Sequence, residues 1–154
     1  MLALLIFVTI MVSTIAAEYE YQFGNYSLYH SENAYCGPYL HDYSGLLAGF
    51  VATYDIDDKE KDTRGYVGYN SDQTTIYVVF RGTTDVANWL TDLDAVMTDY
   101  PLCHDCSVHK GFLDAEQRVY PGVFEEVTKL KAEFPSYGII VTGHSLGAAL
   151  ATLV

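Results

Sequence analysis

Residues 138–154, GIIVTGHSLGAALATLV, constrain the fold of this chain more than any other segment. The apolar run GIIVT is typical of a strand buried in a sheet covered on both faces, and SLGAALATLV is typical of a helix. Between them the GHSLG pattern places Ser145 on a sharp strand-to-helix turn, where Gly143 and Gly147 remove side chains that would strike neighbouring backbone. The segment therefore predicts an α/β protein with Ser145 as a nucleophile. The alternative is a tight structural turn that holds an ordinary serine.

The first 17 residues carry no charged side chain and end in two alanines directly before Glu18. This pattern is typical of a signal peptide cleaved after Ala16 or Ala17, although a basic n-region is missing apart from the amino terminus. An uncleaved anchor is the alternative, but the run is at the short limit for a membrane span. We expect a signal peptide at residues 1–17, one domain at 18–154, no stable membrane span after cleavage, and a location outside the cell or in the secretory lumen.

Composition narrows the classes of partner. The formal net charge is −12 and only eight Lys and Arg are present, which argues against binding nucleic acid. The same charge repels anionic membrane surfaces, so lipid contact must be apolar or with neutral lipid. Export makes disulfides possible, and three cysteines, an odd number, leave one thiol free or without its partner. The glycosylation sequon Asn25-Tyr26-Ser27 has meaning only if the chain is exported.

The N-terminal half of the domain is expected to be rich in strands. Residues 21–40 are rich in Tyr and predict an irregular or helical lead-in that wraps the domain. The runs LLAGFVATYD, RGYVGYN and TTIYVVFRG are rich in β-formers and are separated by the polar segments DIDDKEKDT and NSDQ. They predict consecutive antiparallel strands.

Helices are expected further along the chain. In DVANWLTDLDA, residues 85–95, apolar side chains recur at helical spacing and predict a short amphipathic helix. A loop holding Pro101 leads to residues 111–134, which are helical in period, and the pair Pro121-Gly122 should kink or divide that helix. Pro135 should end it.

Three motifs, VVFRGTTDVANWLTDL, VHKGF and GHSLGAAL, occur in this order. In sequence and spacing they resemble the fungal-type triacylglycerol lipases, lipase class 3, of the α/β-hydrolase fold. The resemblance covers roughly residues 34–154, the first half or somewhat more of a family domain. It implies an α/β-hydrolase-like sheet flanked by helices and incomplete at the C-terminus. It also implies a serine carboxylic ester hydrolase that uses no metal or other cofactor.

The resemblance also assigns an oxyanion hole. Thr83, which follows F-R-G, would supply an N–H and a hydroxyl, and Asp92 would hold that hydroxyl by a hydrogen bond. Without the resemblance, the sequence around Thr83 would indicate an ordinary threonine in a turn. Leu146 has independent support, because the free N–H at a helix start can point at charge developing on a substrate carbonyl.

The helix over residues 85–95 corresponds, by the same resemblance, to the family's lid. Val86, Trp89 and Leu90 would cover the site in water and turn to lipid at a lipid–water interface. Without the resemblance, the same stripe indicates plain core packing. A hinged apolar lid would explain how an acidic protein contacts lipid, because burial of Trp and Leu needs no positive charge.

The C-H-D-C segment has several interpretations: a redox pair, half of a zinc site with His104 and His109, or a local structural disulfide. No nearby second cysteine or histidine pair completes a zinc site, which favours the disulfide. The resemblance likewise implies a bridge between Cys103 and Cys106, as in some secreted members. It also matches Cys36 to a cysteine that bridges to the far C-terminus, and this sequence holds no such partner.

A serine nucleophile needs a base. His144 should face away from Ser145 by strand alternation, and His109 lies in a motif that the family uses for structure. The family's catalytic Asp and His follow the nucleophile helix, so no residue here matches them. We expect a fragment of an acylglycerol lipase that is inactive alone. The alternative is a catalytically inactive protein that binds lipid or a partner. Phospholipids, galactolipids and feruloyl esters remain open as substrates.

Overall fold

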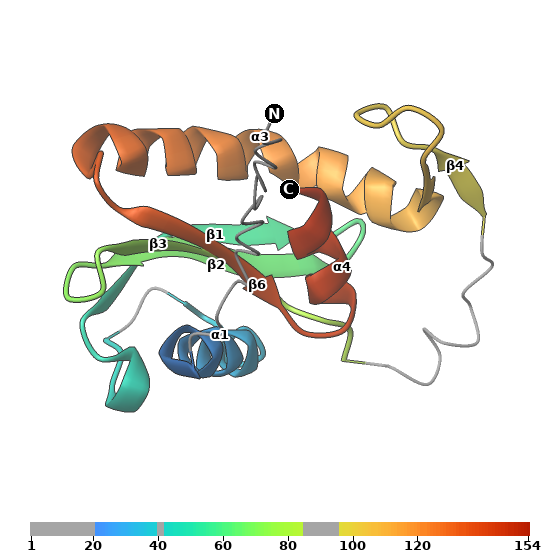
Figure 1. Ribbon diagram of the computed structural model, residues 1–154. Helices are drawn as coiled ribbons and strands as arrows, with labels where there is room; N and C mark the ends of the chain where they lie inside the picture. The colour runs from blue at the N-terminus through green and yellow to red at the C-terminus, as the bar shows by residue number, and fades with distance from the viewer. Residues whose placement is uncertain (1–20, 40–41, 85–95) are drawn as a thin grey trace, which may run out of the picture.

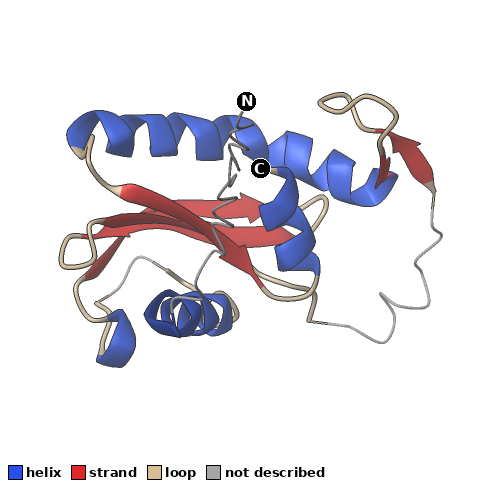
Figure 2. Ribbon diagram, in the orientation of Figure 1, coloured by secondary structure: helices blue, strands red, loops and turns tan. Residues whose placement is uncertain are grey.

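The computed structural model describes residues 21–39, 42–84 and 96–154. A four-stranded sheet with the strand order β1-β2-β3-β6 forms its centre. Helix α1 lies on one face of this sheet, and α3 and α4 lie on the other (Figure 1). Helices on both faces of a sheet that contains a parallel pair make an α/β architecture, as predicted (Figure 2).

The first three strands form an antiparallel meander, as the sequence predicts. Their bounds are Phe50–Asp58 for β1, Thr63–Asn70 for β2 and Thr75–Phe80 for β3. The strand β6, Gly138–Gly143, pairs parallel with β3, and Phe80 lies opposite Gly143. Because the two strands are parallel, the segments that follow them begin at the same end of the sheet.

Alternation along β3 divides the interior into two cores. Ile76, Val78 and Phe80 pack with α3 and α4, whereas Tyr77 and Val79 pack with Ala34 after α1 and with other aromatic side chains. All six side chains of β3 are buried. A strand covered on both faces in this way holds the end of β3, and the residues that follow it, in place.

The lead-in forms the helix α1, Tyr21–Asn33, followed by a short 3-10 helix η1, Gly45–Leu47. The inner face of α1 carries His30, whose ring lies 4.1 Å from that of Tyr77 between centroids. The His30 Nδ1 and the Tyr66 hydroxyl lie 2.9 Å apart. Burial lowers the pKa of His30 to about 3.

Helix α3, Lys110–Glu133, runs through Pro121 without division, so of the two predicted outcomes, a kink or a division, the division is wrong. Val119 and Val123, on either side of the proline, are both buried against the sheet, so the helix is packed on it before and after Pro121. A side chain at Gly122 would strike the Tyr54 hydroxyl, which explains why a glycine follows the proline. The helix ends before Pro135, as predicted.

Strand β6 and helix α4, Leu146–Leu153, form where the sequence predicts them, but β6 is less buried than expected. Ile140 packs toward α1 and Val141 toward α3 and α4, so both faces are covered. Ile139 is nevertheless 47% exposed. The cause is position: β6 is the last strand of the described sheet, and no described strand lies beside its outer edge.

A second, two-stranded sheet was not predicted. It pairs β4, Met97–Asp99, with β5, Ser107–His109, around the loop that holds Cys103 and Cys106. These two cysteines form a disulfide, as predicted, and Cys36 is free and exposed. The strands are too short to produce a periodic sequence signal.

Within the described ranges, no helix is long and apolar enough to cross a membrane. The expected signal peptide at residues 1–17 and the expected lid at 85–95 lie outside these ranges, as does Asp92.

Candidate active site

Ser145 occupies the turn between β6 and α4 with a strained backbone. Its φ is 56° and its ψ is −121°, a conformation that non-glycine residues rarely adopt. The turn is closed by hydrogen bonds from the Gly147 N–H to the His144 carbonyl, 2.9 Å, and from the Ala148 N–H to the Ser145 carbonyl, 3.0 Å. Strain of this kind persists only where surrounding structure enforces it, and it is common at functional sites.

Two glycines allow the turn to pack against the end of β3. A Cβ atom at Gly143 would meet the backbone of Gly147 and the Phe80 carbonyl oxygen. A Cβ atom at Gly147 would meet the backbone of Phe80 and Arg81. The sequence argument for both glycines therefore has a geometric basis, because their neighbours are backbone atoms that cannot move aside.

The exit of β3 lies directly beside the serine. A Cβ atom at Gly82 would meet the Ser145 Cβ, the His144 carbonyl oxygen and the Tyr35 hydroxyl. Thr83 is the next residue along the chain. On the other side of the serine, Leu146 begins α4, so its N–H has no acceptor within the helix. Parallel pairing of β3 with β6 thus brings the Gly82-Thr83 segment and Leu146 to the same end of the sheet as Ser145.

A contact that the sequence did not predict joins α1 to this turn. The Tyr35 hydroxyl and His144 Nδ1 lie 2.9 Å apart, and the two rings meet edge to face with centroids 6.1 Å apart. Tyr35 follows α1 closely, while His144 directly precedes the serine. No local pattern could have revealed this pair, because 109 positions separate the two residues.

The rings of the two nearby histidines, His144 and His109, each contact another aromatic side chain. Nδ1 of His144 is engaged with Tyr35. The ring of His109 packs against Phe112, with centroids 4.5 Å apart, and its two buried nitrogens have no partner among the described residues. In the described part of the chain, no hydrogen bond joins the Ser145 hydroxyl to a histidine ring.

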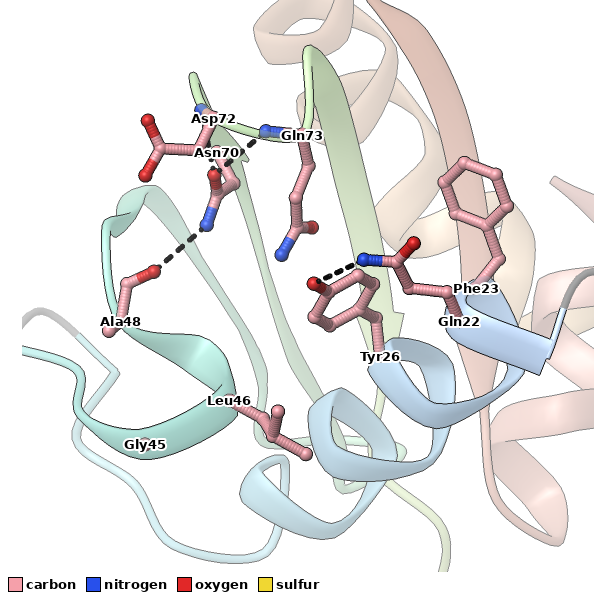
Figure 3. A pocket seen from close by; sticks show the side chains of 9 residues that line it. All are labelled: Gln22, Phe23, Tyr26, Gly45, Leu46, Ala48, Asn70, Asp72 and Gln73. Atoms are coloured by element: carbon pink, nitrogen blue, oxygen red, sulfur yellow. Dashed lines mark hydrogen bonds between the residues drawn. The ribbon is translucent and has the colours of Figure 1, made fainter.

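Two hollows of the described structure are not lined by the serine. One of about 400 Å³ lies between α1, η1 and the β2–β3 turn, and Figure 3 shows Tyr26 and Gln73 on its walls. Because Gln73 precedes β3, this hollow opens at the end of the sheet opposite Ser145. A second, of about 410 Å³, is lined by Tyr35, Arg81 and charged residues of β1 and β2. Backbone geometry, and not cavity size, singles out Ser145.

No group of three or more His, Cys, Asp or Glu side chains that could hold a metal ion occurs in residues 21–39, 42–84 and 96–154. Cys103 and Cys106 are bonded to each other, and their Cα atoms lie 5.4 Å apart. Their thiols therefore cannot bind a zinc ion as thiolates while the bridge is intact.

Comparison with known proteins identifies the family. The family model for Lipase (class 3) matches residues 77–154. A lipase of Rhizomucor miehei is 42% identical over 92 residues, which is 60% of this chain and 25% of that protein. Secreted mono- and diacylglycerol lipase A of Penicillium camembertii is 36% identical over 106 residues, 68% of this chain and 35% of that protein.

Solved structures agree with the sequence relatives. The Rhizomucor miehei lipase propeptide complex superposes with a TM-score of 0.78 at 33% identity and covers 88% of this chain and 46% of its own. Lipase II from Rhizopus niveus superposes with a TM-score of 0.79 at 32% identity, and the match covers 86% of this chain and 52% of that one. The chain spans 25% and 35% of the two sequence relatives and about half of these solved chains. It has the α/β-hydrolase fold and belongs to the class 3 lipase family.

Proposed function

We propose that Ser145 is the nucleophile of a secreted lipase that hydrolyses acylglycerol esters. The observation that carries this proposal is the strained backbone of Ser145 on a strand-to-helix turn packed against the end of β3. A solved triacylglycerol lipase, 32% identical with a TM-score of 0.78, is described as having a serine protease triad at its catalytic centre. It covers 88% of this chain, and Ser145 lies within residues 77–154, which the family model matches.

In the proposed reaction, the Ser145 hydroxyl attacks the ester carbonyl and gives its proton to a base. The oxyanion that forms accepts hydrogen bonds from the Leu146 N–H and from the N–H and hydroxyl of Thr83, with Asp92 orienting the Thr83 hydroxyl. Loss of one such donor typically costs about a hundredfold to a thousandfold in rate. The alcohol leaves with the proton from the base, and water then releases the acyl group from the serine.

The proposal assigns the base, a histidine, and its orienting carboxylate to sequence that follows residue 154. Two observations support this assignment. His144 Nδ1 is occupied by the Tyr35 hydroxyl, and His109 packs against Phe112. Residues 1–154 alone should therefore hydrolyse esters very slowly. The proposal also makes Val86, Trp89 and Leu90 the apolar face of a lid that contacts lipid at an interface.

A p-nitrophenyl butyrate assay tests the assignment. It compares residues 18–154, a longer product that continues through the C-terminal half typical of the relatives, and the Ser145→Ala variant of each. We expect turnover only from the longer product, with a loss of roughly a thousandfold or more in its Ser145→Ala variant. Serine-dependent turnover by residues 18–154 at lipase-like rates would place the base within them. An inactive longer product that still binds lipid would indicate a non-catalytic lipid-binding protein.

A further inference from the structure

The outer face of α1 carries the N-linked glycosylation sequon. Side chains four, seven, eight and eleven positions apart share one face of a helix, so Asn25 lies in line with Tyr21, Leu28, Tyr29 and Glu32. The opposite face holds His30, which is buried. Asn25 itself is partly exposed. The helix therefore turns the amide of Asn25 away from the sheet.

Apolar side chains surround Asn25 on this face. Tyr21 is 72% exposed, Leu28 is 63% exposed and Tyr29 is 42% exposed. Tyr21 stands one helical turn before Asn25, while Leu28 and Tyr29 stand one turn after it. An exposed apolar stripe on an outer helix promotes association unless something covers it. A branched, strongly hydrated sugar attached at Asn25 would lie over all three side chains.

We propose that Asn25 carries an N-linked glycan that shields this apolar face of α1. In the transfer, the anomeric carbon of a polyprenyl-diphosphate-linked oligosaccharide breaks its bond to a phosphate oxygen and forms a bond to Asn25 Nδ2. The phosphate leaves with the bonding electrons, and the amide nitrogen gives up one proton. The sequon is the only N-x-S/T sequence in the 154 residues. Asn25 is thus the one acceptor that this sequence offers.

The glycan would not obstruct Ser145. Asn25 lies eight residues before the end of α1, about 12 Å along the helix axis at the usual rise per residue. The contact between α1 and the serine turn is made beyond that end, by Tyr35. The proposal depends on export of the chain and is independent of whether the protein hydrolyses esters.

To test whether Asn25 is glycosylated, the protein is expressed with residues 1–17 in place in a eukaryotic host and collected from the medium. Matched variants are Ser27→Ala, which destroys the sequon, and Ser27→Thr, which preserves it; Asn25→Gln removes the acceptor by a different local change. We expect wild type and Ser27→Thr to lose apparent mass on treatment with an N-glycan amidase, with Asn25 converted to Asp in the peptide map. Wild-type protein with unmodified Asn25 in the medium overturns the proposal, and so does a chain that is never exported.

Shielding is tested by aggregation. Ser27→Ala and Asn25→Gln should both aggregate faster than Ser27→Thr, and adding Leu28→Gln to Ser27→Ala should restore the slower rate. The same Leu28→Gln change should have little effect where the glycan is present. Equal aggregation of Ser27→Ala, Asn25→Gln and Ser27→Thr would overturn the shielding role.

Discussion

Adding a single methyl group at Gly143 tests how tightly the turn at Ser145 is packed. Gly143→Ala places its Cβ against the backbone of Gly147 and Phe80, whereas Gly138→Ala, on the same strand, finds open space. We expect Gly143→Ala to lower the free energy of unfolding by about 1–3 kcal/mol and Gly138→Ala to change it by less than about 0.5 kcal/mol. Urea unfolding of both variants measures the difference, and equal values would show that the turn can relax.

The Tyr35 hydroxyl should matter for rate more than for substrate affinity. In the longer product that the proposal expects to be active, Tyr35→Phe keeps the ring but removes the hydrogen-bond partner of His144, the residue directly before the proposed nucleophile Ser145. A hydrogen bond of this kind contributes about 0.5–1.5 kcal/mol, so kcat should fall roughly twofold to tenfold with KM little changed. Tyr29→Phe, on the outer face of α1, is the control. A Tyr35→Phe enzyme as fast as that control would leave the contact without a catalytic role.

At this scale the sequence was informative where the chemistry is local. The G-x-S-x-G pattern holds, within five residues, both the serine and the two glycines that its strained turn requires. The pattern alone therefore predicts the geometry of the turn. Tyr35 could not be found in the same way, because only the packing of α1 on the sheet brings it to His144. Thr83 is intermediate between Ser145, which its own motif predicts, and Tyr35, which no sequence signal predicts. Only the resemblance to a family pointed to Thr83, and its own sequence context did not.

Among the elements, α1 should make stability depend on pH through His30. Burial lowers the pKa of His30 from 6.5 to about 3, so between these values the unfolded chain binds a proton that the folded chain does not. Stability should therefore fall as the pH drops through this window, by on the order of 5 kcal/mol in total. His30→Phe should flatten the dependence in urea unfolding, and the exposed His104→Gln should not. Parallel curves for wild type and His30→Phe would contradict this account.

The segment over residues 85–95 supplies a second element-scale prediction, argued from the sequence. If Trp89 contacts lipid, Trp89→Ala in the active product should reduce hydrolysis of emulsified triglyceride far more than hydrolysis of a dissolved short-chain ester. Aromatic side chains bury about 150–250 Å², so the loss of interfacial stabilisation can reach several kcal/mol. A buried core tryptophan would instead lower both activities together, along with the melting temperature.

Element boundaries could be read from the sequence where one signal dominated. The run of β-forming residues in β3 and the proline after α3 both predicted the observed element. Of the two outcomes predicted at Pro121, a kink or a division, division does not occur, because side chains on both sides of the proline pack against the sheet. The β4–β5 pair was missed because three-residue strands around a disulfide are defined by the loop and not by periodicity.

For the molecule as a whole, the outer edge of β6 should control solubility of residues 18–154. An apolar hollow of about 180 Å³ there is lined by residues that include Val78, Phe124 and Ile139. Ile139→Lys should therefore raise the soluble fraction of this product after expression. The matched control is Val51→Lys on β1, the other end strand, where the side chain is 45% exposed compared with 47% for Ile139. Equal gains from both variants would reflect added charge alone.

The parallel contact between β3 and β6 also has a consequence for the order of folding. The β1–β2–β3 meander closes through short turns, but Phe80 can meet Gly143 only after a loop of about sixty residues has closed, an entropically slower event. Ser145 and the Gly82-Thr83 segment are therefore assembled late. We expect a chain still emerging from the ribosome to form the β1–β2–β3 meander first and to bring the turn at Ser145 beside the Gly82-Thr83 segment only once β6 has been made.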